Sequence, residues 1–143
     1  MQAGIDVLIV DDSDADVRDT LQAIRSALSQ PAVTRMKDGD AAAQFMFRTG
    51  MFQDRPAVLP RLVLLEIDIP IVHGLELLRR LRRDPATREI PLVVLSANRN
   101  PVVMEEAYLL GAREYLAKPH DRDEYVAEVA KLVSRWVQAP PTQ

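Results

Sequence analysis

The chain has 143 residues and a mass of 16.1 kDa, a size typical of one domain. Hydrophobic residues make up 48% of it and charged residues 27%, which excludes a disordered chain. The net charge of −3 argues against a nucleic-acid-binding protein, whose affinity comes largely from a basic face. Cysteine is absent and only two histidines are present, His73 and His120, so neither a disulfide framework nor a His/Cys metal site is expected.

The amino-terminal segment carries no targeting signal. It lacks the basic region of a signal peptide, and its apolar run ends at acidic residues, Asp11 and Asp12. No apolar stretch approaches the ~20 residues that a membrane-spanning helix needs. We therefore expect a soluble protein of the cytoplasm, where the absence of cysteine also fits a reducing compartment.

Short apolar runs alternate along the chain with longer segments in which apolar residues recur at helical spacing. The runs predict five strands: residues 5–10, 32–36, 62–67, 92–95 and 113–117. The first, third and fourth runs do not alternate with polar residues, which is typical of parallel strands buried on both faces.

Each predicted strand is followed by a predicted helix. Capping residues mark several helix ends, with Ser13 and Asp121 as N-caps, Asn100-Pro101 as a helix opening and Gly111 as a stop. In the third helix an arginine run is expected to lie on the solvent side: Arg79, Arg80, Arg82 and Arg83. Five strand–helix units predict one α/β domain over residues 1–138, with a parallel sheet covered by helices on both faces and a frayed tail at 139–143.

Polar residues stand where the predicted strands end. They are Asp11 and Asp12, Glu66 with Asp68 just beyond, Ser96, and Lys118. Because ligands of open α/β sheets bind at the carboxyl ends of the strands, we expect these groups on one rim. Hard carboxylate oxygens suit Mg²⁺, while a lysine and a hydroxyl can bind phosphoryl oxygens.

Four stretches resemble the response-regulator receiver domain of two-component signalling: VLIVDDSDAD (7–16), PRLVLLEIDIPIVHG (60–74), PLVVLSA (91–97) and GAREYLAKP (111–119). The resemblance covers essentially the whole chain and is greatest to the short receivers paired with phytochrome-type histidine kinases. It implies a flavodoxin-like, doubly wound five-stranded sheet of order 2-1-3-4-5 with five helices. It also implies a sensor histidine kinase as partner.

The resemblance further implies a weak Mg²⁺ site. Asp12 and Glu66 would ligate the metal directly, Asp11 would act through water, and the backbone carbonyl of Asp68 would complete the set. The metal would neutralise charge during in-line phosphoryl transfer.

The same resemblance assigns the switch. Ser96 matches the hydroxyl that bonds the phosphoryl group in the active state, and Lys118 matches the lysine that binds phosphoryl oxygen. Tyr115 matches the aromatic residue that turns inward on activation, and the Lys118–Pro119 peptide would be cis.

Glu66 departs from the family pattern at its central position, where the family has the aspartate that becomes phosphorylated. The extra methylene moves the carboxylate outward by ~1.5 Å. A misplacement of ~1 Å can cost on the order of a hundredfold in rate, so we expect little or no acyl phosphate on Glu66. Two interpretations remain: a receiver that works without phosphorylation, or an inactivated one.

No sequence remains after the last helix to build an output domain. We therefore expect a single-domain response regulator that is not an enzyme and that signals by protein contact through its fourth and fifth helices.

Two other motifs match the sequence in part. The Asp12/Asp14 pair resembles the DxD motif of haloacid-dehalogenase-type Mg²⁺-dependent phosphatases, but Asp16 stands where that motif has Thr or Val. The same aspartates mimic the start of an EF-hand loop, which fails because Val17 stands where Gly is required. The phosphatase stays as the alternative function.

The last predicted helix has an unusually wide apolar face. A valine stripe should face the sheet, and Tyr125, Leu132 and Trp136 widen the arc beyond the ~100° that a surface helix usually buries. Since exposed apolar patches mark interaction sites, we expect a homodimer with these three residues at the interface.

Overall fold

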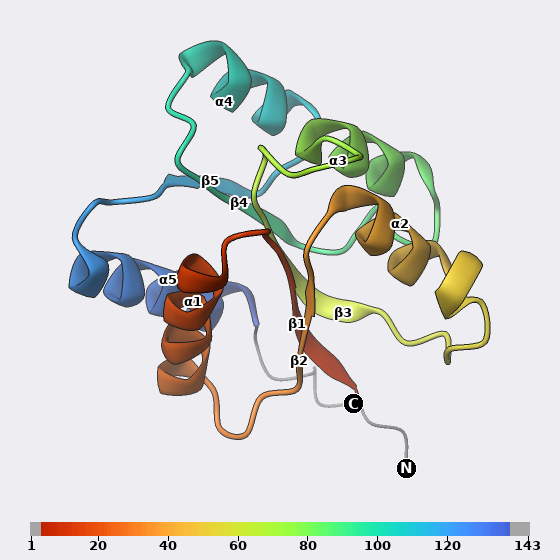
Figure 1. Cartoon of the computed structure of the whole chain (residues 1–143), viewed down its shortest axis with the longest axis horizontal. Helices are drawn as coiled ribbons and strands as arrows, with labels where there is room; N and C mark the ends of the chain where they lie inside the picture. Colours follow the sequence, from red (N-terminus) through yellow and green to blue (C-terminus); the bar gives the residue numbers. More distant parts are fainter. Residues whose placement is uncertain (1–3, 138–143) are drawn as a thin grey trace.

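The computed structural model describes residues 4–137, so the predicted tail at 139–143 lies outside the described residues. Five strands and five α-helices alternate along the chain (Figure 1). They are β1 (Ile5–Val10), α1 (Asp14–Ala27), β2 (Val33–Met36), α2 (Gly39–Phe47), β3 (Pro60–Leu65), α3 (Gly74–Arg83), β4 (Leu92–Ser96), α4 (Pro101–Leu109), β5 (Glu114–Ala117) and α5 (Arg122–Trp136). A short 3₁₀ helix, Gly50–Phe52, lies in the loop between α2 and β3.

The strands form one sheet of order β2-β1-β3-β4-β5, and every neighbouring pair is parallel. The predicted flavodoxin-like topology is therefore confirmed. Because the chain reverses its direction of winding between β2 and β3, helices fall on both faces of the sheet. Figure 1 shows α2, α3 and α4 on one face and α1 and α5 on the other.

Successive side chains of each inner strand point to opposite faces of the sheet and pack in two separate hydrophobic cores. In β1, Leu8 and Val10 pack with α2, α3 and α4, whereas Val7 and Ile9 pack with α1 and α5. This alternation explains why β1, β3 and β4 read as unbroken apolar runs, since both faces of the strand are buried.

The largest difference in strand boundaries concerns β3, which spans Pro60–Leu65 and not the predicted 62–67. Ile5 of β1 pairs with Pro60, which extends the start of β3, and the last pair is Val10 with Leu65. Since β1 ends at Val10, Glu66 has no partner residue on β1. Glu66 therefore begins the loop, although its N–H still donates to the Val10 carbonyl at 2.9 Å.

The predicted helix caps are confirmed. The side chains of Ser13, Asn100 and Asp121 accept hydrogen bonds from backbone N–H groups in the first turns of α1, α4 and α5. Gly111 follows α4 with a φ of +109°, a conformation that a residue with a Cβ rarely adopts. His73 caps α3, since its imidazole Nδ1 accepts from the Leu75 N–H at 3.2 Å.

The wide apolar arc of α5 is covered within the chain, so the premise of the predicted dimer interface is wrong. Tyr125 and Leu132 are only 4% and 5% exposed and pack in the core between α5, α1 and the sheet. Trp136 is half-buried, and its indole N–H donates to Glu114. The helix α1 lies beside α5 and supplies the cover that a sheet alone would not give (Figure 1).

Arg82 was also wrongly expected to lie on the solvent side of α3. Its guanidinium donates to the backbone carbonyls of Gly111, Arg88 and Ile90 at 2.8 to 3.2 Å. Arg82 therefore ties the end of α3 to the segment before β4 and to the turn after α4. Within residues 4–137, no helix combines the length and the apolar character needed to cross a bilayer.

Candidate functional site

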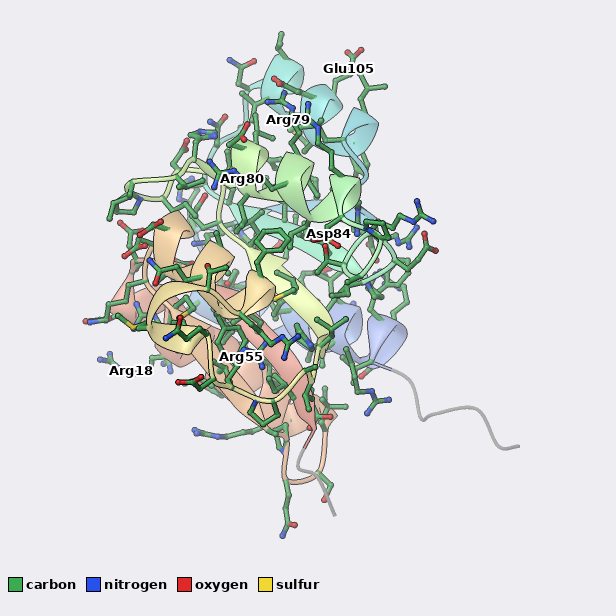
Figure 2. All side chains as sticks on the ribbon, turned by 90° about the vertical axis from the view of Figure 1, so that its right-hand side faces the viewer. Arg18, Arg55, Arg79, Arg80, Asp84 and Glu105 are labelled. Atoms are coloured by element: carbon green, nitrogen blue, oxygen red, sulfur yellow. The ribbon has the colours of Figure 1, made fainter. Side chains whose placement is uncertain are left out.

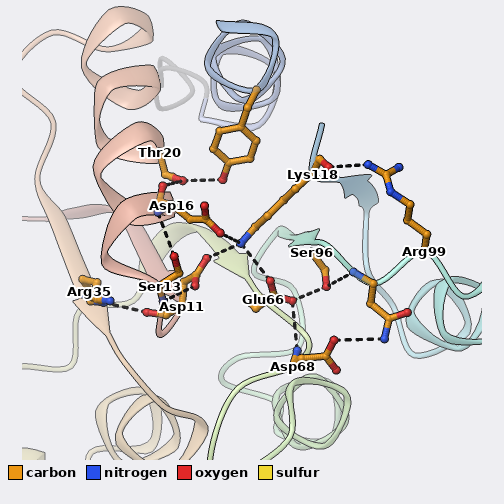
Figure 3. Close-up of polar contacts among 12 residues, drawn as sticks. Asp11, Ser13, Asp16, Thr20, Arg35, Glu66, Asp68, Ser96, Arg99 and Lys118 are labelled. Atoms are coloured by element: carbon orange, nitrogen blue, oxygen red, sulfur yellow. Dashed lines mark hydrogen bonds and ion pairs between the residues drawn. The ribbon is translucent and has the colours of Figure 1, made fainter. Parts of the chain in front are cut away.

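Four of the six polar residues predicted for the rim meet at the carboxyl end of the sheet, whereas the side chains of Asp12 and Asp68 are exposed. Asp11 follows β1, Glu66 follows β3, Ser96 ends β4 and Lys118 follows β5. Figure 3 shows their side chains pointing toward one another. All four are buried.

The Lys118 ammonium is the centre of this site. Its Nζ lies 2.9 Å from Asp11 Oδ2, 2.7 Å from Asp16 Oδ2 and 3.0 Å from Glu66 Oε1. Lys118 is only 9% exposed, so its charge has little access to water. The three carboxylates follow β1, lie on α1 and follow β3. They take the place of the water molecules that the ammonium loses when it is buried.

The pKa shifts reflect this balance. Burial alone would lower the pKa of the Lys118 ammonium, but the hydrogen bonds to Asp16 and Asp11 outweigh it, so the pKa is raised. Burial raises the pKa of the Asp11 carboxyl despite its bond to Lys118, and the nearby charge of Glu66 adds to the rise. The two shifts have different causes, since burial dominates for Asp11 and the bonds to carboxylates dominate for Lys118.

Both oxygens of the Glu66 carboxylate are bound within the protein. Oε1 faces Lys118, and Oε2 accepts a short hydrogen bond from the Ser96 hydroxyl and another from the Asp68 N–H at 3.2 Å. One carboxylate therefore spans the lysine and the serine. The start of α3 lies directly against this loop, since a Cβ on Gly74 would come within 2.8 Å of the Glu66 carbonyl oxygen.

The predicted metal ligands are not gathered into a metal site. Lys118 occupies the space between the Asp11 and Glu66 carboxylates, while the exposed Asp12 makes no hydrogen bond or ion pair within residues 4–137. The Asp68 side chain is also exposed. Among the described residues, no three acidic or histidine side chains are arranged to hold a metal ion.

The loop after β4 is bound to the site from two sides. The Asn98 N–H donates to the Ser96 hydroxyl at 3.1 Å, and the Asn98 amide donates to Asp68 at 3.3 Å. Tyr115 is 8% exposed, and its hydroxyl donates to the Asn98 carbonyl at 2.6 Å. Burial raises the pKa of Tyr115, so this donor keeps its proton at neutral pH. Tyr115 thus points inward and holds the loop that follows Ser96.

Lys118 is also held by its backbone. Arg99 donates to the Lys118 carbonyl at 2.6 Å, which connects the loop after β4 to the end of β5 (Figure 3). The expected cis bond between Lys118 and Pro119 is wrong, because no peptide bond among the described residues is cis.

A buried polar chain continues from Lys118 toward α5. The Thr20 hydroxyl donates to the Asp16 carbonyl at 2.8 Å and lies 2.7 Å from the Tyr125 hydroxyl. Since the Thr20 proton is used on Asp16, Tyr125 donates to Thr20. Burial raises the pKa of Tyr125 to about 12.

Sequence reasoning missed part of this site. Asp16 was considered only against the phosphatase and EF-hand motifs, and Thr20, Asn98 and Arg99 were not singled out. The spacing of Asp16 and Thr20, four residues apart on one helix face, could have identified the polar side of α1. Nothing in the sequence pattern signals the bond from Arg99 to a backbone carbonyl.

Asp12 and Asp14 do not act together as the phosphatase alternative requires. The Asp14 carboxylate pairs with Arg35 at 2.9 Å, and this bond holds the pKa of Asp14 below its usual range. Arg35 also donates to the Asp11 carbonyl at 2.9 Å, which fixes the loop after β1. The geometry therefore does not favour the alternative.

Sequence comparison gives a consistent family. The family model for the response regulator receiver domain matches residues 7–130. Response regulator Rcp1 of Synechocystis sp. is 28% identical over 132 residues, covering 92% of this chain and 88% of Rcp1. Response regulator PleD of Caulobacter vibrioides is 32% identical over 126 residues, which are 88% of this chain but 25% of PleD.

Solved structures agree with this result. The phosphorylated cyanobacterial phytochrome response regulator RcpA has a TM-score of 0.86 and 26% identity, with 94% of each chain covered. The Mn²⁺-bound form of Rcp1 also has a TM-score of 0.86, with 27% identity and 96% and 97% coverage of this chain and of Rcp1. Since the family model covers most of its length, the chain belongs to the response-regulator receiver family of two-component signalling.

Proposed function

We propose that the protein is a single-domain response regulator whose site holds a signalling arrangement without phosphorylation, with Glu66 at the phosphoacceptor position. The observation that carries this proposal is that one carboxylate, that of Glu66, reaches from the lysine to the serine. It contacts both Lys118 and Ser96, the two residues that in the family bind the phosphoryl group. The longer side chain thus supplies negative charge at the place where a phosphoryl group would bring it.

The position of Tyr115 supports the same proposal. Its ring is buried and its hydroxyl bonds the loop after Ser96, which corresponds to the inward position expected of the activated switch. The Glu66–Ser96 bond and the Tyr115–Asn98 bond hold the two ends of this short loop. Their joint effect is to favour one loop conformation.

The same contacts argue against phosphoryl transfer to Glu66. In-line transfer needs a free carboxylate oxygen as nucleophile, with Lys118 and the serine hydroxyl available for the incoming phosphoryl oxygens. Here both carboxylate oxygens are already bound, and Lys118 and Ser96 are bound to Glu66 itself. Phosphorylation would require all of these bonds to break.

The proposed partners are a sensor histidine kinase of the phytochrome type and a downstream protein. The proposed compartment is the cytoplasm. Two of the most similar solved structures are described as a cyanobacterial phytochrome response regulator and as a response regulator in red light signalling of R. palustris. In this proposal the protein acts by contact and not by catalysis.

Mg²⁺ is proposed as a weak ligand. Asp12 is exposed and unpaired within the described residues, so its carboxylate can attract a divalent cation. Direct ligation by Glu66 would require it to leave Ser96 or Lys118. This competition is the physical reason for weak binding.

Intact-mass measurement after incubation with acetyl phosphate and Mg²⁺ tests the proposal. We expect no phosphoryl mass on the wild-type protein and a gain of one phosphoryl mass on Glu66→Asp, whose carboxylate is withdrawn by ~1.5 Å from Ser96. Asp68→Asn is the matched control and should leave the wild-type spectrum unchanged. Stoichiometric phosphate mapped to Glu66 would contradict the proposal.

Amide hydrogen exchange separates the two interpretations of Glu66. If Glu66 maintains the signalling arrangement, Glu66→Ala should raise exchange at residues 97–100, because Ser96 loses its partner. Unchanged exchange in this loop would indicate that Glu66 only inactivates the site.

A further inference from the structure

A second polar region lies at the opposite end of the sheet from Lys118. A cavity of about 360 Å³ opens between the end of α2, the loop before β3 and the segment after α3. Its apolar lining includes Met46, Phe47 and Leu59, and its charged lining is Arg48, Arg55 and Asp84. The volume lies in the range of small-molecule sites.

A shallower hollow of about 450 Å³ adjoins this cavity and shares Phe47 and Asp84 with it. It adds Arg80 and Arg83 to the lining. Figure 2 looks onto α2 and α3 and labels Arg55, Arg80 and Asp84 on this side. We call the two hollows together the arginine groove. It carries four arginines against one aspartate on a chain whose net charge is −3.

The charges of the arginine groove are poorly neutralised by the protein. The side chains of Arg48 and Arg83 make no hydrogen bond or ion pair within the part of the chain that the structure describes. Arg80 pairs with Glu76 at 3.1 Å. The Asp84 carboxylate caps the segment after α3 by accepting from the Ala86 N–H at 2.8 Å.

Arg55 adds a buried donor without a partner. Its guanidinium lies over the Phe45 ring at 3.8 Å, and its Nε and Nη1 donate to backbone carbonyls. Its Nη2 is buried and has no hydrogen-bond partner among residues 4–137. Burial and the nearby charge of Arg48 lower the pKa of Arg55. Since the Nη2 atom is buried, Arg55 contributes its positive charge to the groove and not a free donor.

We infer that the arginine groove binds a phosphate monoester that carries an aromatic or apolar body. A phosphate monoester has a charge between about −1.5 and −2 at pH 7 and so matches the unpaired guanidinium groups of Arg48 and Arg83. Guanidinium forms paired hydrogen bonds to phosphate oxygens. The apolar floor around Phe47 and Leu59 would bury the body of the ligand.

This site is separate from the proposed phosphorylation-independent switch, since it lies at the amino ends of the strands. Its ligand would provide a second input to the protein, independent of the kinase. Failure of one proposal therefore leaves the other standing.

Amide chemical shifts on the full-length protein test the inference, with phenyl phosphate as probe. We expect saturable shifts at residues 46–48, 55–59 and 84–87 and weaker binding of inorganic phosphate, which lacks the apolar body. Adenosine 5′-monophosphate distinguishes the source of the phosphate: tighter binding than phenyl phosphate identifies a nucleotide, and weaker binding identifies a smaller aryl phosphate.

Arg48→Gln and Arg83→Gln should each weaken phenyl phosphate binding about tenfold or more, because each removes a charged donor. Both side chains are exposed, so neither change should disturb folding. Arg18→Gln is the matched control, since Arg18 is exposed on α1 and outside the groove (Figure 2). Equal binding by all three variants would overturn the inference. So would shifts centred on Asp11 and Lys118, binding no tighter than that of inorganic phosphate, or no saturable shift at millimolar concentration.

Discussion

Replacing Lys118 by methionine should strongly destabilise the fold, because it leaves buried carboxylates without their counter-ion. Asp11 and Glu66 are buried beside Lys118, and Asp16 contacts it from a more exposed position. Removing one partner of a buried ion pair costs about 3–5 kcal/mol. We expect a loss in this range at pH 7.

The loss should shrink as the pH falls. Without Lys118, the folded-state pKa of Asp11, which burial already raises, rises further above 3.8. The folded variant then binds a proton more readily than the unfolded chain, so the variant gains stability as the pH falls toward 4. The raised pKa of Lys118 stabilises the wild type fully below 10.5, so this contribution is constant between pH 5 and pH 7.

Urea unfolding followed by the fluorescence of Trp136, the single tryptophan, measures both effects. With a slope of about 1.5 kcal/mol per molar urea, the midpoint at pH 7 should fall by about 2–3 M. Lys131→Met is the matched control, because Lys131 is exposed and, within residues 4–137, pairs only with Glu128; its change should stay within about 0.5 kcal/mol. A loss below about 1 kcal/mol at pH 7, or an equal loss at pH 5, would refute the reasoning.

Three further predictions follow from the site and from α5. Tyr125→Phe should cost about 1 kcal/mol at pH 7 by removing the donor to Thr20. The pKa of Tyr125 is raised from 10.0 to about 12, so between pH 10 and pH 12 the wild type should lose about 2–3 kcal/mol more than Tyr125→Phe, measured by urea unfolding; equal losses in both proteins would contradict the assignment. Isothermal titration at low salt should detect millimolar Mg²⁺ binding that Asp12→Ala abolishes, and binding unchanged by this substitution would place the metal elsewhere. Tyr125 and Leu132 are buried, so the predicted dimer is left with Trp136 as its one partly exposed residue of the three; light scattering tests it, because a dimer that Trp136→Ala dissociates would support the prediction and a wild-type monomer at tens of micromolar would contradict it.

The order of elements and the position of the rim residues were predictable from the sequence for a definite reason. Parallel strands buried on both faces leave unbroken apolar runs, and each run here ends in a polar residue such as Asp11 or Ser96. Caps such as Ser13 and Asn100 act on their own helices, so local sequence is sufficient to identify them.

The errors arose where a side chain acts across elements. The arginine pattern of α3 placed Arg82 in solvent, yet its partners are carbonyls up to 29 residues away. The apolar arc of α5 was judged against a sheet alone, although α1 covers Tyr125 and Leu132. The metal site remains a prediction from the residue types on the rim, and periodicity could not show that Lys118 would lie between the carboxylates.

Lys118 is held at both ends, and thermodynamic linkage gives this arrangement a measurable consequence. Its ammonium binds Asp11, Asp16 and Glu66, while its carbonyl accepts from Arg99 in the loop after β4. A protein that displaces Arg99 and shifts Lys118 would change the proton affinity of Asp11. By reciprocity, protonation of Asp11 changes the affinity for that protein by the same factor. The affinity of a partner that shifts Lys118 in this way should therefore depend on pH near the pKa of Asp11. This holds even when the partner itself has no group that titrates there.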